Sequence, residues 1–193
     1  DGLKAVCKIA EKSKKESVAT GLKNEIAIHQ KMPLNHPNIV KLYGVTETSS
    51  HVYFLLERCQ KSLSHELRDR PYKRFSEHEA RSVFLDILKG VRYVHSMGVL
   101  HRDIKPRNIL LGDDGRWKIC DFGLSIHKDD QDHRVCGTRT YMSPDIIRKQ
   151  SHTEATDVWS LGVTLYVMLM GNVPFEASKR PELYHKIKNS KGS

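Results

Sequence analysis

The sequence predicts an α+β fold in two parts, a small strand-rich N-terminal part and a larger helical C-terminal part. Short runs rich in β-branched and aromatic residues recur through the first part, and such runs favour strands. Beyond them, apolar residues recur three and four positions apart over long segments, which favours helices. No repeat and no Gly/Ser-rich or Pro-rich linker interrupts the 193 residues. We therefore expect the two parts to meet directly, near residues 57–61.

The N-terminal part is predicted to contain three strands and one helix. A strand is expected at Leu3–Ala10, and a helix at Lys15–Met32, where Leu22 and Ile26 fall on one face. The segments "NIVKLYGV" and "HVYFLLE" read as two further strands, joined by a polar turn at Glu47–Ser50. This order predicts a small sheet with one helix packed against it.

The C-terminal part carries clear helix boundaries. Ser76 and Glu79 form a capping box ahead of a long amphipathic helix that is expected to close at Gly98. The short strands "NILL" and "WKIC" follow, separated by the turn "GDDG". An apolar helix is expected from Asp157, and a basic helix after Pro181.

Composition argues against several classes of function. The net charge is +9, but the basic residues are scattered and form no aromatic-rich stripe, so we expect no nucleic-acid partner. The most apolar segment, Val158–Met170, is shorter than the ~20 residues that a bilayer span needs, so we expect no membrane partner. The four cysteines form no CxxC pair, which predicts reduced thiols and an intracellular, cytoplasmic location.

A polar cluster in "HRDIKPRNILL" suggests the chemistry. Asp103 and Asn108 precede a strand, and the next strand ends at "DFG", which should bring Asp121 close to Asn108. An amide oxygen and a carboxylate that converge suit Mg²⁺, which keeps other positions for phosphates. Asp103 is then free to accept a hydroxyl proton, and Lys105 can steady a migrating phosphoryl group. The array predicts phosphoryl transfer.

These segments resemble the eukaryotic protein-kinase signature set. "HRDIKPRN" is followed by "DFG" thirteen residues after Asn108 and by "SPD" at 143–145, while "AVCK", "LKNEIAIH" and "DVWSLG" match further motifs in family order. The resemblance implies a bilobal fold, with residues 1–59 as a partial N-terminal lobe and 60–193 as a partial C-terminal lobe. It also implies ATP and Mg²⁺ as cofactors and a protein Ser/Thr hydroxyl as acceptor.

The resemblance assigns roles to individual residues. Asp103 and Lys105 would be catalytic, and Asn108 and Asp121 would bind the metal. The expected ATP-binding residues are Lys8, its partner Glu25, Val6 as roof, Leu110 as floor, and the backbone of Glu57 and Cys59 at the adenine edge. The expected regulatory or structural residues are Arg102, Phe122, Gly123, Thr138 and Asp157.

Simpler interpretations stay open for single residues. Lys8 and Glu25 alone could form an ordinary surface ion pair, and Asp157 could be a helix N-cap. His29 and His101 are expected to be core residues, with His101 packed beneath Phe122.

The subfamily is suggested by smaller details. Lys105 is typical of Ser/Thr kinases, and "EIAIH", "LLERC", "FSEHEAR" and the "CGT" and "SPD" segments resemble the polo-like kinases. "YVHSMGVLHRD" favours their centriole-duplication branch, and with it a centrosomal or centriolar location. "IKPRN" is the general kinase form, so an aurora-like or calcium/calmodulin-kinase-like enzyme is the alternative.

The expected Gly-rich loop and last C-lobe helices are missing. The chain therefore resembles a fragment whose regulatory domains lie elsewhere, and a non-catalytic interaction module is the second interpretation.

The segment after "DFG" departs from the family pattern. Residues 126–137, "IHKDDQDHRVCG", contain no Ser, Thr or Tyr that could be phosphorylated, and Arg134 stands where related kinases carry a Thr. The segment does contain Asp129, Asp130 and Asp132. Either these carboxylates form a solvated acidic loop, or one of them, Asp132 being favoured, pairs with Arg102 in place of a phosphate.

Overall fold

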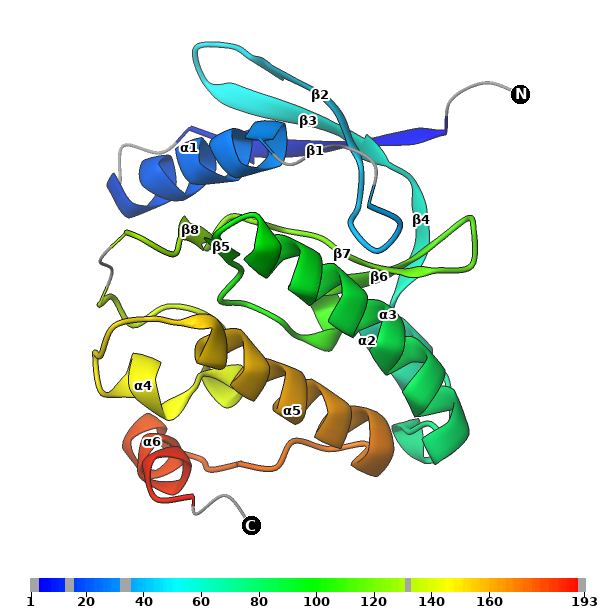
Figure 1. Cartoon of the computed structure of the whole chain (residues 1–193), viewed down its shortest axis with the longest axis vertical. Coiled ribbons are helices and arrows are strands. Elements are labelled where there is room, and N and C mark those ends of the chain that lie inside the picture. Colours follow the sequence, from blue (N-terminus) through cyan, green and yellow to red (C-terminus); the bar gives the residue numbers. More distant parts are fainter. Residues whose placement is uncertain (1–3, 13–15, 32–35, 131–132, 191–193) are drawn as a thin grey trace.

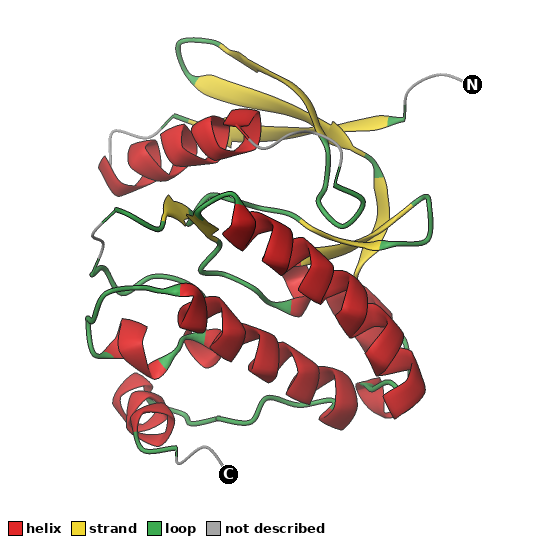
Figure 2. Ribbon diagram, in the orientation of Figure 1, coloured by secondary structure: helices red, strands yellow, loops and turns green. Residues whose placement is uncertain are grey.

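The computed structural model describes residues 4–12, 16–31, 36–130 and 133–190. A three-stranded sheet with one helix lies at the top of the molecule, and a larger, mainly helical part lies below it (Figure 1). Figure 2 shows the strands gathered in the upper and middle part and the long helices below. The predicted two-part α+β architecture is confirmed.

The upper sheet is antiparallel and has the order β1-β3-β2. It consists of β1 (Ala5–Glu11), β2 (Leu42–Glu47) and β3 (His51–Glu57). Helix α1 (Glu16–Lys31) packs on one face, and a small core of Leu42, Val52 and Phe54 forms there with Ala10, Leu22 and Ile26 against it. The apolar spacing in α1 therefore has the predicted role of attaching the helix to the sheet.

A second antiparallel sheet lies where the two parts meet. Its order is β4-β6-β7, formed by β4 (Cys59–Ser62), β6 (Ile109–Gly112) and β7 (Trp117–Ile119). The chain passes from the upper sheet to this one at Arg58, and the division into lobes at residue 59 stays a prediction. A two-stranded pair of β5 (Val99–Leu100) with β8 (Ile126–His127) lies on the other side of the loop 101–108.

The lower part is built around two long helices, α3 (Glu77–Ser96) and α5 (Glu154–Met170), which lie side by side (Figure 1). The shorter helices are α2 (Leu63–Arg68), α4 (Pro144–Ile147) and α6 (Arg180–Lys188). Single 3₁₀ turns occupy 71–73, 106–108 and 139–141. The main core runs between α3, α5 and the second sheet and includes Val83, Ile87, Val91, Ile109, Phe122, Leu161 and Met168.

The start of α3 follows from its sequence. The Glu79 carboxylate accepts from the Ser76 backbone N–H at 2.9 Å, and the Ser76 hydroxyl accepts from the Glu79 N–H at 3.4 Å. Buried apolar residues then recur on the inner face of the helix, which ends at Ser96, just before Gly98. The predicted capping box and helix are confirmed.

Other boundaries differ from the expectation. Helix α5 begins at Glu154 with Thr153 as N-cap, so Asp157 lies inside the helix and the N-cap interpretation of Asp157 is wrong. The segments that form α2, α4, β5 and β8 were not predicted, because they are short and depend on contacts with distant parts of the chain. The four cysteines, all of which lie in the described ranges, form no disulfide there. Among the described residues, no helix is both long and apolar enough to span a membrane.

Candidate active site

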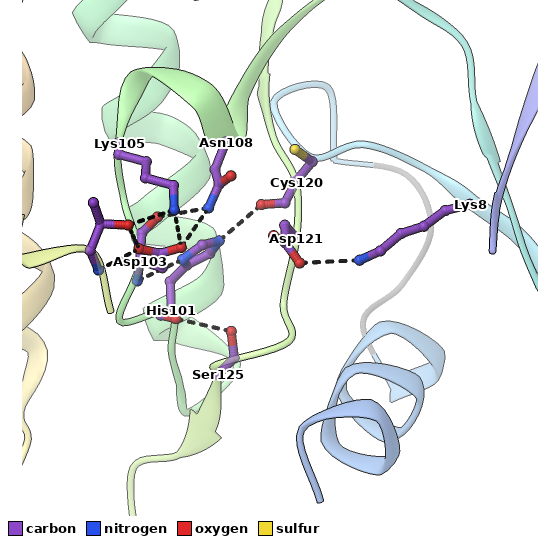
Figure 3. Close-up of polar contacts among 9 residues, drawn as sticks. Lys8, His101, Asp103, Lys105, Asn108, Cys120, Asp121 and Ser125 are labelled. Atoms are coloured by element: carbon purple, nitrogen blue, oxygen red, sulfur yellow. Dashed lines mark hydrogen bonds and ion pairs between the residues drawn. The ribbon is translucent and has the colours of Figure 1, made fainter. Parts of the chain in front are cut away.

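The upper half of the site is a lysine shared by two carboxylates. Lys8 lies on the face of β1 that looks toward α1, and its Nζ contacts Glu25 Oε1 at 2.7 Å. The same Nζ contacts Asp121 Oδ1 at 3.1 Å, a contact shown in Figure 3. The three residues come from β1, α1 and the segment after β7. Three separate elements therefore meet at one ammonium group.

Burial and charge oppose each other at this triad. Burial alone would lower the pKa of Lys8, but Glu25 and Asp121 raise it, so the amine stays charged. Burial raises the pKa of Glu25 despite the attraction of Lys8. Burial would also raise the pKa of Asp121, yet Lys8 holds it below its usual range. Asp121 is thus kept as an anion while part of its side chain stays exposed.

Asp121 and Phe122 point in opposite directions from one strained turn. Asp121 has a φ of +67°, a left-handed conformation that is costly for a residue with a side chain. Phe122 is fully buried, with its ring 4.8 Å from that of His29 and 5.1 Å from that of His101. The turn therefore directs the carboxylate toward Lys8 while the aromatic ring anchors the segment in the core.

Helix α1 comes unusually close to this segment at Gly21. A Cβ at residue 21 would lie 2.9 Å from the carbonyl oxygen of Gly123, closer than side chains tolerate. Glycine therefore permits a contact that brings the following turn of α1, with Glu25, within reach of Lys8. This role of Gly21 was not predicted, because nothing in the local sequence indicates a close approach to residues a hundred positions later.

The lower half of the site centres on the buried carboxylate of Asp103. Its Oδ1 accepts from the Thr138 N–H at 3.0 Å and from the Thr138 hydroxyl at 2.8 Å. Its Oδ2 accepts from Lys105 Nζ at 2.5 Å and from Asn108 Nδ2 at 3.0 Å (Figure 3). A carboxylate has about four acceptor positions, so these donors fix the group in one orientation.

The loop that carries Asp103 is held from below by Asp157. This carboxylate is completely buried in α5 and accepts from the backbone N–H groups of His101 at 2.9 Å and Arg102 at 2.7 Å. His95 Nε2 approaches the same carboxylate at 2.8 Å. Burial would raise the pKa of Asp157, but these hydrogen bonds lower it. His95 was not predicted, since it lies 62 residues away in sequence.

His101 fixes the other side of the loop. The Asp103 N–H donates to His101 Nδ1 at 3.2 Å, so Nδ1 is the unprotonated nitrogen. The proton therefore lies on Nε2, which donates to the carbonyl of Cys120 at 3.1 Å (Figure 3). Ser125 adds a hydrogen bond from its hydroxyl to the His101 carbonyl at 3.2 Å. The imidazole thus links the loop of Asp103 to the segment that carries Asp121.

The predicted metal ligands lie at adjoining strand ends. Asn108 precedes β6 and Asp121 follows β7, and the Cys120 N–H donates to the Asn108 carbonyl at 3.0 Å. The Asn108 side-chain nitrogen donates to the carbonyl and the carboxylate of Asp103. The amide oxygen is therefore the atom of this side chain that could bind a cation. Within the described ranges no cluster of three or more His, Cys, Asp or Glu side chains could hold a metal unaided. The donor set fits Mg²⁺ that also binds phosphates.

The four residues expected around adenine come from strands that meet at the junction of the two sheets. Val6 on β1 pairs with Leu56 of β3, next to Glu57. Cys59 begins β4 and lies opposite Gly112 of β6, two residues after Leu110. Burial raises the pKa of the Cys59 thiol to about 11, so it stays neutral. The structure brings these residues to one region, and their contact with adenine stays a prediction.

The acidic segment is only partly described. Asp130 accepts from the His127 N–H at 3.3 Å, and Asp129 lies 3.2 Å from His127 Nδ1. Arg102 is buried, with Nε donating to the Leu124 carbonyl at 2.7 Å and Nη1 lying 2.8 Å from His152 Nδ1. Asp132 lies outside the described residues. Its pairing with Arg102 remains a prediction.

The fold and the geometry together define a class of protein. The site combines a lysine that contacts two carboxylates with an asparagine that donates to a buried aspartate, which is the arrangement of a phosphotransferase of the kinase type. Comparison of sequences leads to the same result. The chain belongs to the protein kinase domain family, whose model matches residues 1–192.

Similar proteins include Ser/Thr kinases of more than one subfamily. The chain is 40% identical over 167 residues to the Drosophila melanogaster protein "Serine/threonine-protein kinase polo", an alignment that covers 85% of the chain and 28% of that protein. It is 38% identical over 167 residues to Aurora-2 of Arabidopsis thaliana, covering 86% of the chain and 58% of the relative. It is 36% identical over 191 residues to PLK4 of Xenopus tropicalis, covering 96% and 20%.

These comparisons confirm the resemblance to polo-like kinases, but the similar identity to an aurora kinase does not separate the two subfamilies. The chain spans less than a third of the polo and PLK4 relatives and somewhat over half of the aurora relative. The comparisons therefore do not define the substrates and partners of the whole protein.

Proposed function

We propose that the protein transfers the γ-phosphoryl group of ATP to Ser or Thr hydroxyls of protein substrates. The observation that carries the proposal is the Asp103 carboxylate, held by four donors and placed below the Lys8–Glu25–Asp121 triad. Such an array suits a reaction in which positioning and charge stabilisation supply most of the catalysis.

Each residue then has a defined task. Lys8, oriented by Glu25, pairs with the non-transferred phosphates of ATP. The Asn108 amide oxygen and the Asp121 carboxylate would hold Mg²⁺, which when bound supplies positive charge against the phosphate oxygens. The substrate hydroxyl attacks the γ-phosphorus, the bond to the ADP oxygen breaks, and Asp103 accepts the hydroxyl proton.

Lys105 must move during the reaction. Its ammonium group contacts both Asp103 Oδ2 at 2.5 Å and Thr138 Oγ1 at 2.6 Å. All four acceptor positions of Asp103 are occupied in this arrangement. We infer that Lys105 turns toward the γ-phosphate when a hydroxyl arrives, so that the hydroxyl takes its place at Asp103. Lys105 and Thr138 also support Ser/Thr as acceptor, as the family resemblance implies.

The proposed kinase subfamily rests on the resemblance to polo-like kinases. A polo-like kinase is our preferred subfamily, with an aurora-like or calcium/calmodulin-kinase-like enzyme as the alternative. The four cysteines, which form no disulfide among the described residues, support an intracellular location. A site of action at the centrosome or centriole, and regulatory domains outside this chain, remain predictions.

The test is phosphoryl transfer by the whole protein to Ser/Thr peptides with Mg²⁺–ATP. Asp103→Asn keeps the size of the side chain but removes the proton acceptor, so kcat should fall by a factor of about 10² or more. Nucleotide affinity, measured by calorimetry, should stay within about twofold because Lys8, Asn108 and Asp121 are untouched. Turnover that survives in Asp103→Asn would remove Asp103 from this role. Exposed Asp113→Asn, on the turn between β6 and β7, is the matched control.

A further inference from the structure

An ion pair between the buried Lys118 and the partly buried Glu57 crosses the junction of the two sheets. Lys118 of β7 is 5% exposed, and its Nζ lies 2.5 Å from Glu57 Oε1 at the end of β3. Asp114 of the turn after β6 contacts the same ammonium at 3.2 Å. Arg58 is the single residue that joins β3 of the upper sheet to β4 of the second sheet. The ion pair adds a non-covalent connection beside this covalent one, as do the backbone hydrogen bonds of Asn38 and Val40 with Ile119 of β7.

Glu57 is held by three bonds on two of its groups. Its N–H donates to the Lys41 carbonyl at 2.8 Å, and its Oε2 accepts from the Lys41 N–H at 3.1 Å. Lys118 holds the remaining carboxylate oxygen. The contact to the Glu57 carbonyl that the described residues show is a long one from the Cys59 thiol, at 3.9 Å. The side chain is thus anchored on both sides while the carbonyl keeps capacity for a stronger donor.

The Lys118 side chain reaches Glu57 by passing over Gly112 of β6. A Cβ at residue 112 would lie 2.5 Å from Lys118 Cε and 2.5 Å from Asp114 Oδ1. The backbone of Gly112 is not in the left-handed region, so alanine fits the local conformation. Gly112 is required here by the lysine that crosses it, and not by its own φ. Because Gly112 has no Cβ, the Lys118 side chain can extend from β7 across β6 to Glu57 at the end of β3.

We propose that Lys118 is a positioning residue for recognition of the nucleotide base, acting through Glu57. This inference rests on the proposed use of ATP. When Lys118 and Lys41 hold the carboxylate of Glu57, the carbonyl of the same residue is fixed where an adenine amino group can donate to it. Gly112 belongs to the same device because it admits the lysine. The ion pair then contributes to choice of base and not to phosphoryl transfer.

The proposal has a physical reason beyond proximity. The Glu57 side chain is 19% exposed, so a carboxylate at this position that loses its cation can turn toward water. Burial opposes the charge on Lys118, and Glu57 and Asp114 restore it, so its pKa is raised. Removal of the cation therefore frees the Glu57 side chain to rotate, and the adjoining backbone loses its fixed position. A hydrogen bond to a displaced carbonyl is weakened for adenine, whereas a base without the amino group loses nothing.

The experiment compares ATP with inosine triphosphate, whose base carries an oxygen in place of the amino group. The ratio of kcat/KM for the two nucleotides is measured on one Ser/Thr peptide with the whole protein. In Lys118→Met this ratio should fall about tenfold, equal to about 1.4 kcal/mol, with kcat at saturating ATP little changed. Gly112→Ala should lower the ratio in the same direction, because its methyl group displaces the lysine.

Two further variants separate positioning from general damage. Lys89→Met removes an exposed lysine from the outer side of α3 and should leave the ratio unchanged. Glu57→Gln should lower the ratio, and the double variant Lys118→Met/Glu57→Gln should lose little more than either single change. A variant that is merely less folded loses both activities in proportion, so the ratio would not move.

The outcomes distinguish the role of Lys118 in base recognition from the proposed kinase activity itself. If the wild-type protein uses ATP and the ratio is the same in Lys118→Met and Gly112→Ala, the inference is wrong and the kinase activity stands. If the wild-type protein transfers no phosphate from either nucleotide, the proposed function fails. In that case calorimetric affinities for the two nucleotides still test Lys118, and equal losses of affinity for both in Lys118→Met overturn the inference.

Discussion

The two halves of the site are held together in different ways. In the lower half, several backbone and side-chain donors, including the Lys105 ammonium, converge on the buried carboxylates of Asp103 and Asp157. The upper half depends on one ammonium between Glu25 and Asp121, and the side chains of Lys8 and Asp121 are 38% and 45% exposed. The lower half is contributed by segments packed on one helical core, whereas the upper half needs three elements to meet.

This difference separates stability from assembly. Loss of a buried acceptor that serves several donors costs free energy of unfolding, because each donor is left without a partner. Loss of a partly exposed ion pair costs little stability but removes the charge that aligns the elements. We therefore expect substitutions in the lower half to lower the stability of the protein, and substitutions in the upper half to lower its activity.

The largest effect is expected for Asp157→Ala. His101, Arg102 and His95 would all lose their shared acceptor inside the core. The free energy of unfolding should fall by about 3–5 kcal/mol, the range for removing one partner from a buried charged network. Urea unfolding measures it, with exposed Glu176→Ala as control. A loss below about 1 kcal/mol would show that the lower half does not depend on this carboxylate.

An intermediate effect is expected for Lys8→Met. Activity should fall at least about a hundredfold, while the unfolding midpoint measured below pH 4.5, the ordinary pKa of a glutamate, moves little. Burial already raises the pKa of Glu25, and loss of the cation raises it further. A raised folded pKa means that the stability due to protonated Glu25 is present below the unfolded pKa and is lost as pH rises through the folded pKa, so the variant should lose stability as the pH rises above 4.5, the ordinary value for this group.

The control for Lys8→Met is Lys12→Met, one residue beyond the end of the same strand, whose lysine pairs with Glu47. It should keep both activity and the wild-type dependence of stability on pH. Unchanged turnover in Lys8→Met would make the upper triad an ordinary surface ion pair.

The smallest effect concerns His29, which lies between the halves against Phe122. Its ring nitrogens are buried and have no hydrogen-bond partner among the described residues. Burial, with Lys8 and His101 nearby, lowers the pKa of His29 to about 4 from 6.5. Since the unfolded chain binds the proton more tightly, stability should be complete above pH 6.5, fall as pH drops toward 4, and be about 1 kcal/mol lower at pH 5.5.

His29→Leu should remove this part of the pH dependence, measured by urea unfolding at pH 5.5 and 7.5. The exposed His78→Leu is the matched control. Equal slopes in the two variants would exclude His29 as the source.

The sequence predicts those parts of the molecule that depend on local patterns. The capping box of α3 and the apolar face of α1 need only near neighbours, and the residues of "HRDIKPRN" and "DFG" lie where short loops must bring them. His95, Gly21 and Lys118 could not be found in this way. Each acts on a partner from a distant element, His95 on Asp157 and Lys118 on Glu57. Their roles arise from packing, which a single sequence does not reveal.

The hydrogen bond from the Thr138 amide to Asp103 also gives the protein an internal spectroscopic reporter. An amide proton that donates to a carboxylate at 3.0 Å senses the charge on that carboxylate. The ¹⁵N–¹H resonance of Thr138 should therefore shift when Asp103 takes up a proton or when a substrate hydroxyl displaces one of its donors. Nuclear magnetic resonance of this one amide would follow the state of the proton acceptor in solution, without any turnover of substrate.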